Sequence, residues 1–249
     1  KQLFIRQAVL EMQWIYQVQS NDVRWLQERN VHIWDEWEID ENGFWTAEQM
    51  LPDENGQMKK TVVTKEFGKE WAHTIGTAYG WIVNKFQLTQ NLIKTIKGNP
   101  EDRRMLMSLW QNDYIPTAVL PSCVWSSEWD VTDGKLNAWV HQRSCDVPLG
   151  LPFNITQYAT LLCMLAQVCG LTPGTLNWSI KDAHIYVNQI DPIREQLRRF
   201  DENGSLPAPQ LWLNPEVTDF FAFDNSKDLK DVKLIGYEHM GKLAFPIAT

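Results

Sequence analysis

The sequence lacks three features: Cys-x-x-Cys pairs, long apolar runs and an excess of positive charge. Without that spacing among its four cysteines, a zinc ribbon and a thioredoxin-like motif are excluded, and we expect no metal. Without a signal-peptide pattern or a run long enough to cross a bilayer, we expect a cytoplasmic protein with reduced thiols and no membrane contact. The net charge of −8 leaves no broad basic face, so a nucleic acid is not expected as the main partner.

The residues that are present suit one sizeable domain. The chain has 249 residues, of which 44% are hydrophobic, and this is enough to fill a core. Helical and strand patterns alternate, with hairpin signals among them, which predicts an α/β (α+β) fold with a large mixed β-sheet flanked by helices. We expect helices over 7–29 with a break at 20–22, over 86–97 and over 155–169, and strands over 103–110, 123–130, 136–143 and 182–188. The polar stretch 40–72 predicts a surface insertion that carries a short helix or two.

A cysteine near the middle of the chain is the first candidate for chemistry. Strand alternation in "PSCVWSSEW" (121–129) places Cys123 on one face with Trp125, Ser127 and Trp129. The turn signal at 133–135 returns the chain as a neighbouring strand, which brings Arg143 near Cys123. A thiol needs a positive neighbour to ionise near neutral pH, so this pair fits a nucleophile. A buried structural cysteine is the alternative, and it is the more common fate of a single cysteine.

Other polar residues also have a functional and a structural interpretation. Glu11 shares a predicted helix face with apolar residues, where a solvated or salt-bridged carboxylate is the alternative. The adjacent Arg103 and Arg104 point to opposite faces of a strand; one could bind an anion, or both could be solvated. Asn154 offers an amide that could read a ring carrying a donor and an acceptor, or it could cap a helix. His184 lies on the polar face of "DAHIYVN", which suggests a wet pocket, with a satisfied core histidine as the alternative.

Five motifs together resemble the thymidylate synthase family. They are "QRSCDVPLGLPFN" (142–154), "RR" (103–104), "PSCV" around Cys123, "DAHIY" (182–186) and "HIWDEW" (32–37), and they occur in the family's order. The resemblance covers nearly the whole chain and implies a single catalytic domain over 1–249. Only 40–72 lies outside it, at a place in the small subdomain where some members carry an insertion. The family's Gly-Thr-rich phosphate loop has no counterpart, because the chain starts at "KQLF"; this implies either a missing segment or a weaker phosphate site.

The resemblance also implies the role of each candidate residue. Cys123 would attack C6 of the uracil ring of dUMP, while Glu11 and Tyr79 would manage proton transfers. The implied catalytic set is Cys123, Glu11, Tyr79, Asn154 and Arg143. The implied dUMP-binding set is Arg103, Arg104, Arg143, Ser144, Cys145, Asp146, Asn154, His184, Ile185 and Tyr186. The implied folate-binding set is Trp34, Trp37, Asp146, Leu149, Gly150, Phe153 and Ala248.

The implied activity is reductive methylation of dUMP to dTMP with 5,10-methylenetetrahydrofolate as co-substrate. The implied assembly is a homodimer in which Arg103 and Arg104 reach the partner's phosphate site. Two positions depart from the family's usual pattern: Val124 stands where histidine is usual and Glu128 where glutamine is common. A dUMP hydroxymethylase on the same scaffold is one alternative, and a non-catalytic nucleotide- or RNA-binding homologue is another. Asn154 favours a uracil over a cytosine substrate in each case.

Overall fold

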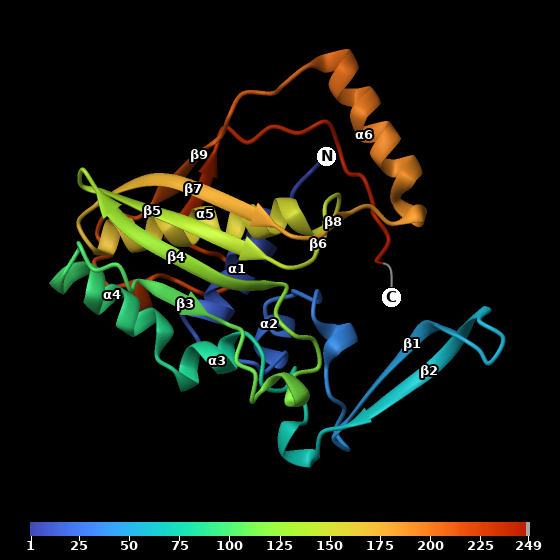
Figure 1. Cartoon of the computed structure of the whole chain (residues 1–249). Helices are drawn as coiled ribbons and strands as arrows, with labels where there is room; N and C mark the ends of the chain where they lie inside the picture. The colour runs from blue at the N-terminus through green and yellow to red at the C-terminus, as the bar shows by residue number, and fades with distance from the viewer. Residues whose placement is uncertain (248–249) are drawn as a thin grey trace.

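A four-stranded mixed sheet forms the centre of the computed structural model, which describes residues 1–247 (Figure 1). The strand order is β3 (Leu106–Ser108), β4 (Val124–Thr132), β5 (Lys135–Gln142) and β7 (Thr172–Ile180). Strand β4 is antiparallel to both of its neighbours, β3 and β5, whereas β5 and β7 are parallel to each other. The tight turn between β4 and β5 uses Asp133 and Gly134, both at positive φ, as a two-residue hairpin requires. The predicted mixed sheet is confirmed.

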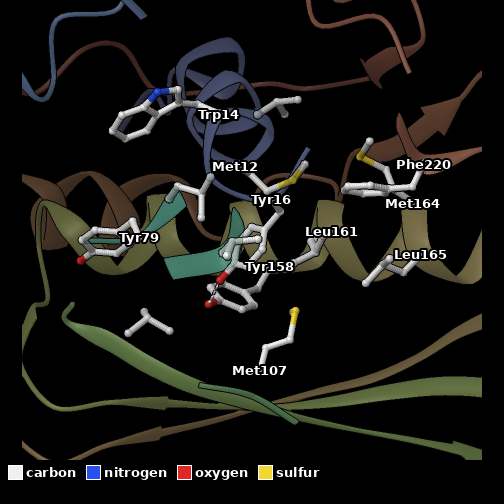
Figure 2. Packing of buried hydrophobic residues seen from close by; sticks show 14 of the residues in the cluster. Met12, Trp14, Tyr16, Tyr79, Met107, Tyr158, Leu161, Met164, Leu165 and Phe220 are labelled. Carbon is white, nitrogen blue, oxygen red and sulfur yellow. Dashed lines mark hydrogen bonds between the residues drawn. The ribbon is translucent and has the colours of Figure 1, made fainter. Parts of the chain in front are cut away.

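Helices cover one face of this sheet. The crossover between the parallel strands is α5 (Gly150–Val168), which packs against both α1 (Ile5–Tyr16) and β7. Figure 2 shows the layer between them, where Met107 of the sheet lies across from Tyr158 and Leu161 of α5. The hydroxyl groups of Tyr16 and Tyr158 are hydrogen-bonded to each other within this apolar layer. The other helices are α2 (Arg24–Gln27), α3 (Gly80–Lys85), α4 (Leu88–Gly98) and α6 (Ile190–Asn203), with short 3-10 turns at Asp35–Trp37, Lys69–Trp71, Ile115–Thr117, Val187–Gln189 and Phe220–Ala222.

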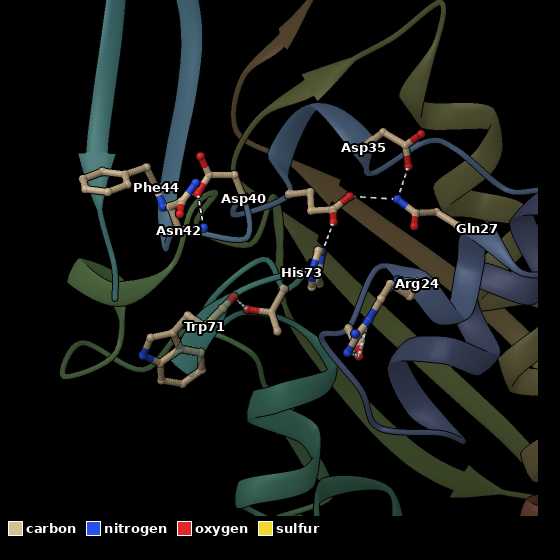
Figure 3. Close-up of polar contacts among 11 residues, drawn as sticks. Arg24, Gln27, Asp35, Asp40, Asn42, Phe44, Trp71 and His73 are labelled. Atoms are coloured by element: carbon tan, nitrogen blue, oxygen red, sulfur yellow. Dashed lines mark hydrogen bonds and ion pairs between the residues drawn. The ribbon is translucent and has the colours of Figure 1, made fainter. Parts of the chain in front are cut away.

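The stretch 40–72 contains a hairpin, so the expected short helices were wrong apart from one 3-10 turn. Strands β1 (Phe44–Pro52) and β2 (Met58–Glu66) pair antiparallel along nine residues each and project from the body of the molecule (Figure 1). The "DENG" sequence at 53–56 makes the tip, because Asp53 Oδ1 accepts from the backbone N–H groups of Asn55 and Gln57. Figure 3 shows the base of the hairpin, where Asp40 Oδ1 accepts from the N–H groups of Asn42 and Phe44.

Two predicted strands are much shorter than expected. The predicted strand 103–110 contains only β3, because Asp102 caps the backbone N–H of Arg104 at 2.8 Å and holds this stretch in a turn. The predicted strand 182–188 contains only β8 (Ala183–His184), which pairs in parallel with β6 (Cys145–Asp146). The chain then enters a 3-10 turn at Val187–Gln189, closed by reciprocal bonds between Tyr186 and Gln189. The predicted helix 7–29 is α1 and α2, separated by the predicted break.

The remaining strands and one irregularity complete the fold. Strands β9 (Gln210–Leu213) and β10 (Val232–Ile235) form a separate antiparallel pair. The register between β4 and β5 shifts between Val124 and Ser126, which is a β-bulge. Because of this bulge, Trp125 is exposed while Ser127 and Trp129 are buried, so the prediction that they share a face was wrong. Within residues 1–247, no helix has both the length and the apolar character needed to span a bilayer.

Candidate active site

Cys123 and Arg143 meet where β4 begins and β5 ends, as the hairpin signal predicts. The backbone N–H of Arg143 donates to the carbonyl of Cys123 at 2.9 Å, and the guanidinium Nη2 lies 3.8 Å from Cys123 Sγ. The same guanidinium donates to the carbonyls of Ser122 at 3.0 Å and Pro121 at 2.6 Å. These bonds fix the positive charge against the segment that leads into the cysteine.

The environment of the Cys123 thiol has two opposing effects on its ionisation. Burial raises the pKa of the thiol, and the nearby Arg143 charge and Tyr79 hydroxyl lower it without cancelling that effect. The backbone N–H of Cys123 donates to Tyr79 Oη at 3.0 Å, so this hydroxyl lies against the cysteine. Tyr79 has a φ of 45° directly before α3, which turns its ring toward the site. The neutral thiol is therefore favoured at neutral pH, and attack requires more positive charge or a base nearby.

Glu11 is a partly buried carboxylate held by neutral donors, and no cation pairs with it among residues 1–247, so the salt-bridged alternative was wrong. Trp34 Nε1 donates to Glu11 Oε1 at 2.9 Å, and Gln157 Nε2 donates to Glu11 Oε2. Burial raises the pKa of Glu11 to about 7, although the two hydrogen bonds act in the opposite direction. A carboxyl group with a pKa near the working pH can both take and give a proton, which is the property of a general acid or base.

Aromatic rings surround this carboxylate. The ring of Trp34 lies 5.5 Å from that of Trp37 and 5.2 Å from that of Tyr79, both in edge-to-face geometry. Trp34 therefore joins Glu11 to the tyrosine that touches Cys123. The residues "HIWDEW" thus supply flat apolar surface beside the Glu11 carboxylate.

Asn154 is the fifth residue of α5, so the helix-cap interpretation was wrong. Its Oδ1 accepts from Gln142 Nε2 at 3.2 Å, and its Nδ2 donates to Gln157 Oε1 at 3.3 Å. Gly150, which opens the helix, packs against Asn154 and Asp146, because a Cβ there would lie 3.7 Å from Asn154 Oδ1 and 3.9 Å from Asp146 Cβ. The half-buried Leu149 and Phe153 belong to the same first turn.

Asp146 is connected to the C-terminal segment. Its Oδ1 accepts from the backbone N–H of Leu149 at 2.9 Å, and its Oδ2 accepts from Gln189 Nε2 at 2.7 Å. Gln189 is fully buried and also donates to the carbonyl of Pro246 at 3.1 Å. Ala248, which sequence reasoning placed near the folate, lies outside the described residues.

The β6–β8 pair brings the "DAHIY" motif to the same region. Asp146 is paired in register with His184, and the backbone N–H of Cys145 donates to the carbonyl of Asp182 at 2.8 Å. The rings of His184 and Tyr186 are 4.9 Å apart in edge-to-face contact, and Ile185 is half exposed. Cys145 is fully buried, and burial raises the pKa of its thiol to about 11. Of the two neighbouring cysteines, only Cys123 is suited to nucleophilic attack.

Arg103 and Arg104 do not join this cluster within one chain. Both are exposed, and Arg104 is paired with Asp102 at 3.0 Å. Leu106 lies opposite Glu128 in the sheet, and the N–H of Trp129 donates to the carbonyl of Met105, so Arg104 lies near the Asp130 end of β4. At ~3.3 Å per residue, that end is roughly 20 Å from Cys123.

Sequence reasoning missed the glutamines of the site. Gln157 and Gln189 are each almost fully buried and each bonds a candidate residue directly. For Gln157 a signal was available, since it lies three residues after Asn154 and so on the same helix face. For Gln189 there was none, because the turn at 186–189 was predicted as the end of a strand.

Comparison with known proteins gives one consistent result. The family model described as thymidylate synthase matches residues 1–249. The thymidylate synthase of Clostridium beijerinckii is 43% identical over 242 residues, which cover 97% of this chain and 78% of that protein. Thymidylate synthase 1 of Bacillus amyloliquefaciens is 36% identical over 256 residues, which cover 99% of this chain and 94% of that protein. Among solved structures, the thermostable thymidylate synthase A from Bacillus subtilis superposes with a TM-score of 0.79 at 35% identity, covering 100% of this chain and 79% of that one.

Proposed function

The chain belongs to the thymidylate synthase family, and from this premise we infer that it is a methyltransferase that converts dUMP to dTMP in nucleotide biosynthesis. The observation that carries this conclusion is the meeting of Cys123, Arg143 and Tyr79 beside the Glu11–Asn154 network. We propose 5,10-methylenetetrahydrofolate as the co-substrate, which supplies a one-carbon unit and a hydride when bound. The products are dTMP and dihydrofolate.

We propose that Cys123 is the nucleophile. Its sulfur forms a bond to C6 of the uracil ring, and the electron pair of the C5–C6 double bond moves toward O4. This makes C5 able to attack the one-carbon unit. After C5 has lost its proton, the bond between the one-carbon unit and the folate nitrogen breaks, a hydride from the folate reaches the exposed methylene carbon, and the sulfur leaves as the C5–C6 double bond is restored. Covalent catalysis of this kind divides one difficult step into easier ones. Arg143 supports the assignment, because its charge favours the thiolate, and with Ser144 it offers a place for the phosphate of dUMP.

We propose that Glu11 acts in its ionised form as the proton acceptor, with Tyr79 as the hydroxyl that exchanges protons near C5. Glu11 has the pKa for that role, and Trp34 links it to Tyr79. Asn154 is proposed to read the uracil edge, since its amide carries both a donor and an acceptor. The ribose hydroxyl is assigned to His184 and Tyr186, with Cys145 and Ile185 lining the same segment.

The residues present fit a folate. Trp37, whose half-buried ring packs edge-to-face on Trp34, offers aromatic surface for a flat ring, and the Asp146 carboxylate offers an acceptor for its N–H groups. Leu149, Gly150 and Phe153 add apolar surface next to Asp146. Gln189 joins Asp146 to Pro246, which supports the proposal that the C-terminal segment with Ala248 covers the folate and keeps water from the reacting carbon.

The buried Glu11 should make stability depend on pH. Its pKa is about 7 in the folded chain and near 4.5 when exposed, so the folded state holds its proton more tightly. The stabilising contribution is complete below pH 4.5 and is lost as the pH rises through 7, with a change of roughly 2–3 kcal/mol in the free energy of unfolding. Urea denaturation from pH 5 to pH 8 should show this loss, and Glu11→Gln should remove it.

The same Glu11 variant should lower kcat by about a hundredfold or more, because a positioned proton acceptor contributes on that order. Glu66→Gln, which changes an exposed carboxylate on the β1–β2 hairpin, is the control and should alter neither quantity. If Glu11→Gln retained full activity, another group would have to accept the proton.

We propose a homodimer that forms through the outer face of the central sheet. Leu106, Trp125 and Trp139 on β3, β4 and β5 are 39–50% exposed, and such large apolar side chains need a partner surface. His141 stacks against Trp139 at 6.2 Å between ring centroids, so the patch is already ordered. A second copy of the chain would cover this patch and would bring the partner's Arg103 and Arg104 to the phosphate of the first copy.

Complementation tests this shared site. Arg104→Ala chains and Cys123→Ala chains should each have little activity. Mixed heterodimers should regain up to about half of the activity of the wild-type dimer, because one of their two sites has both residues. Differently tagged chains, purified as verified heterodimers, provide the measurement, and heterodimers as inactive as their parents would rule out a contribution across the interface.

Reduced cysteines support a cytoplasmic location, since all four cysteines are free and Cys123 must stay a thiol. We also propose that 40–72 is a surface insertion in the small subdomain of a single catalytic domain, because its hairpin projects from the body (Figure 1).

The activity itself is tested by incubating the protein with dUMP and methylenetetrahydrofolate. A rise in the near-ultraviolet absorbance of dihydrofolate is expected, whereas hydroxymethylation would release tetrahydrofolate without that rise.

A further inference from the structure

Gln157 is a buried side chain that touches two candidate catalytic groups at once. It lies on α5 one turn after Asn154 and is 4% exposed. Its Oε1 accepts from Asn154 Nδ2 at 3.3 Å, and its Nε2 donates to Glu11 Oε2. The proposed base reader and the proposed proton acceptor are therefore joined by one amide.

The direction of every hydrogen bond in this chain of amides is fixed at its far end. Trp178 Nε1 can only donate, and it donates to Gln142 Oε1 at 2.9 Å. The backbone carbonyl of Ser144 can only accept, and Gln142 Nε2 donates to it at 3.0 Å. The Gln142 amide therefore has one orientation, with its nitrogen facing Asn154 Oδ1.

The near end agrees with this direction, because the ionised Glu11 carboxylate can only accept and so requires the Nε2 end of Gln157. With Gln142 donating to its Oδ1, Asn154 must present Nδ2 to Gln157, which leaves Gln157 Nε2 to face Glu11. The other oxygen of Glu11 accepts from Trp34 Nε1, which is again a donor only. The ionised carboxylate thus accepts at both oxygens, and adding a proton to either oxygen weakens the bond that this oxygen accepts.

The amide of Asn154 keeps one donor and one acceptor that the network does not use, and their orientation determines which base it can bind. An amide has two N–H donors and two acceptor lone pairs, and the network uses one of each. One donor and one acceptor remain at fixed places, which is the complement of O4 and N3–H on uracil. Without Gln157, the Nδ2 end of Asn154 would lose its partner, and the two orientations of the amide would become closer in energy.

Resting on the function proposed above, we propose that Gln157 is a positioning and specificity-determining residue for the reaction. It holds the Asn154 amide in the orientation that reads uracil, and it stabilises Glu11 as the carboxylate that accepts the proton. The titratable group that interacts with Glu11 from a neighbouring element is Tyr79, just before α3. Cys123 lies against Tyr79, and the charged Arg143 lies against Cys123. Burial raises the pKa of Tyr79 and of the Cys123 thiol, so both are neutral over the range in which Glu11 titrates.

The test compares Gln157→Met with Gln167→Met. Methionine keeps the length of glutamine and removes its hydrogen bonds. Gln167 provides a matched control because it lies on the same helix and donates only to the carbonyls of Asn214 and Val217, away from the site. Both variants are assayed with dUMP and with dCMP over pH 5.5 to 9, after their melting temperatures have been compared.

For Gln157→Met we expect kcat/KM with dUMP to fall about ten- to a hundredfold and the ratio of dUMP to dCMP activity to fall about tenfold. The acidic limb of the pH profile should move upward, because a carboxylate that has lost a donor binds its proton more tightly. Gln167→Met should lower the melting temperature comparably and leave the nucleotide ratio and the pH profile unchanged.

An unchanged ratio and an unchanged acidic limb in Gln157→Met would overturn the proposal while wild-type turnover still upheld the proposed function. If that variant does not fold, Gln157→Glu keeps the length and the acceptor for Asn154 but places a second carboxyl against Glu11. Gln157→Glu should retain the preference for uracil and should move the acidic limb of the pH profile further upward than any other variant. An acidic limb at the wild-type position would also overturn the proposal.

Discussion

Cys123→Ala is expected to lower kcat by several orders of magnitude while the protein still binds dUMP. The alanine cannot form the bond to C6, so C5 stays a poor nucleophile and the covalent route is lost. The guanidinium of Arg143 keeps its bonds to the carbonyls of Pro121 and Ser122, which do not depend on the thiol. Binding of the nucleotide, measured by calorimetry, should therefore change much less than turnover.

The inhibitor 5-fluoro-dUMP gives a second measure of the same step. Together with the folate, it should form a covalent complex with the wild-type chain and none with Cys123→Ala. Cys163→Ala is the matched control, because Cys163 is a half-buried thiol in the middle of α5. Mass spectrometry that located the adduct on Cys145, Cys163 or Cys169 would contradict the assignment.

Asn154→Asp is expected to exchange the preference for uracil for a preference for cytosine. Cytosine has an acceptor at N3 and a donor at its 4-amino group, so an amide in the uracil-reading pose meets two mismatches. A protonated aspartic acid donates to N3 and accepts from the amino group, which matches cytosine. Each buried mismatch costs roughly 1–3 kcal/mol, so we expect kcat/KM to fall at least tenfold with dUMP and to rise at least tenfold with dCMP.

The pH dependence of this switch is a further check on its cause. Activity of Asn154→Asp on dCMP should be greatest at the acidic end of the profile, where the new carboxyl group holds its proton. Asn154→Ala provides the control, because it removes both functions and should lower activity on both nucleotides without reversing the preference. If the ratio of kcat/KM for dUMP and dCMP were the same in Asn154→Asp as in the wild type, Asn154 would not read the base.

The sequence was sufficient for those contacts that depend on local signals. The "DGK" turn placed Arg143 beside Cys123, because a two-residue hairpin fixes which residues lie opposite each other. Glu11 is a candidate from sequence because a carboxylate is unusual on an apolar helix face. Its actual partners, Trp34 and Gln157, come from segments 23 and 146 positions away, and no periodic pattern encodes such contacts.

Prediction failed where side chains compete with the backbone. The strand expected at 182–188 ends at His184, because Gln189 bonds the backbone of Tyr186 and closes a turn. The stretch 40–72 was judged by its polarity, although its β-branched residues on β2 pair well with β1. The bulge after Val124 separates Trp125 from the face that Ser127 and Trp129 share, and an extra residue in a strand leaves no composition signal.

Tyr79 shows what the site demands of the fold. Its φ of 45° and ψ of −108° belong to the region that glycine occupies at the first central position of a type II′ turn. A tyrosine there costs on the order of 1–3 kcal/mol relative to a relaxed backbone. The position is therefore a point of local frustration: the residue that the backbone favours has no hydroxyl to accept from the Cys123 N–H and no ring to pack on Trp34. Backbone stability and the contacts of the candidate site favour different amino acids at this one residue, and the chain carries the one that makes the contacts.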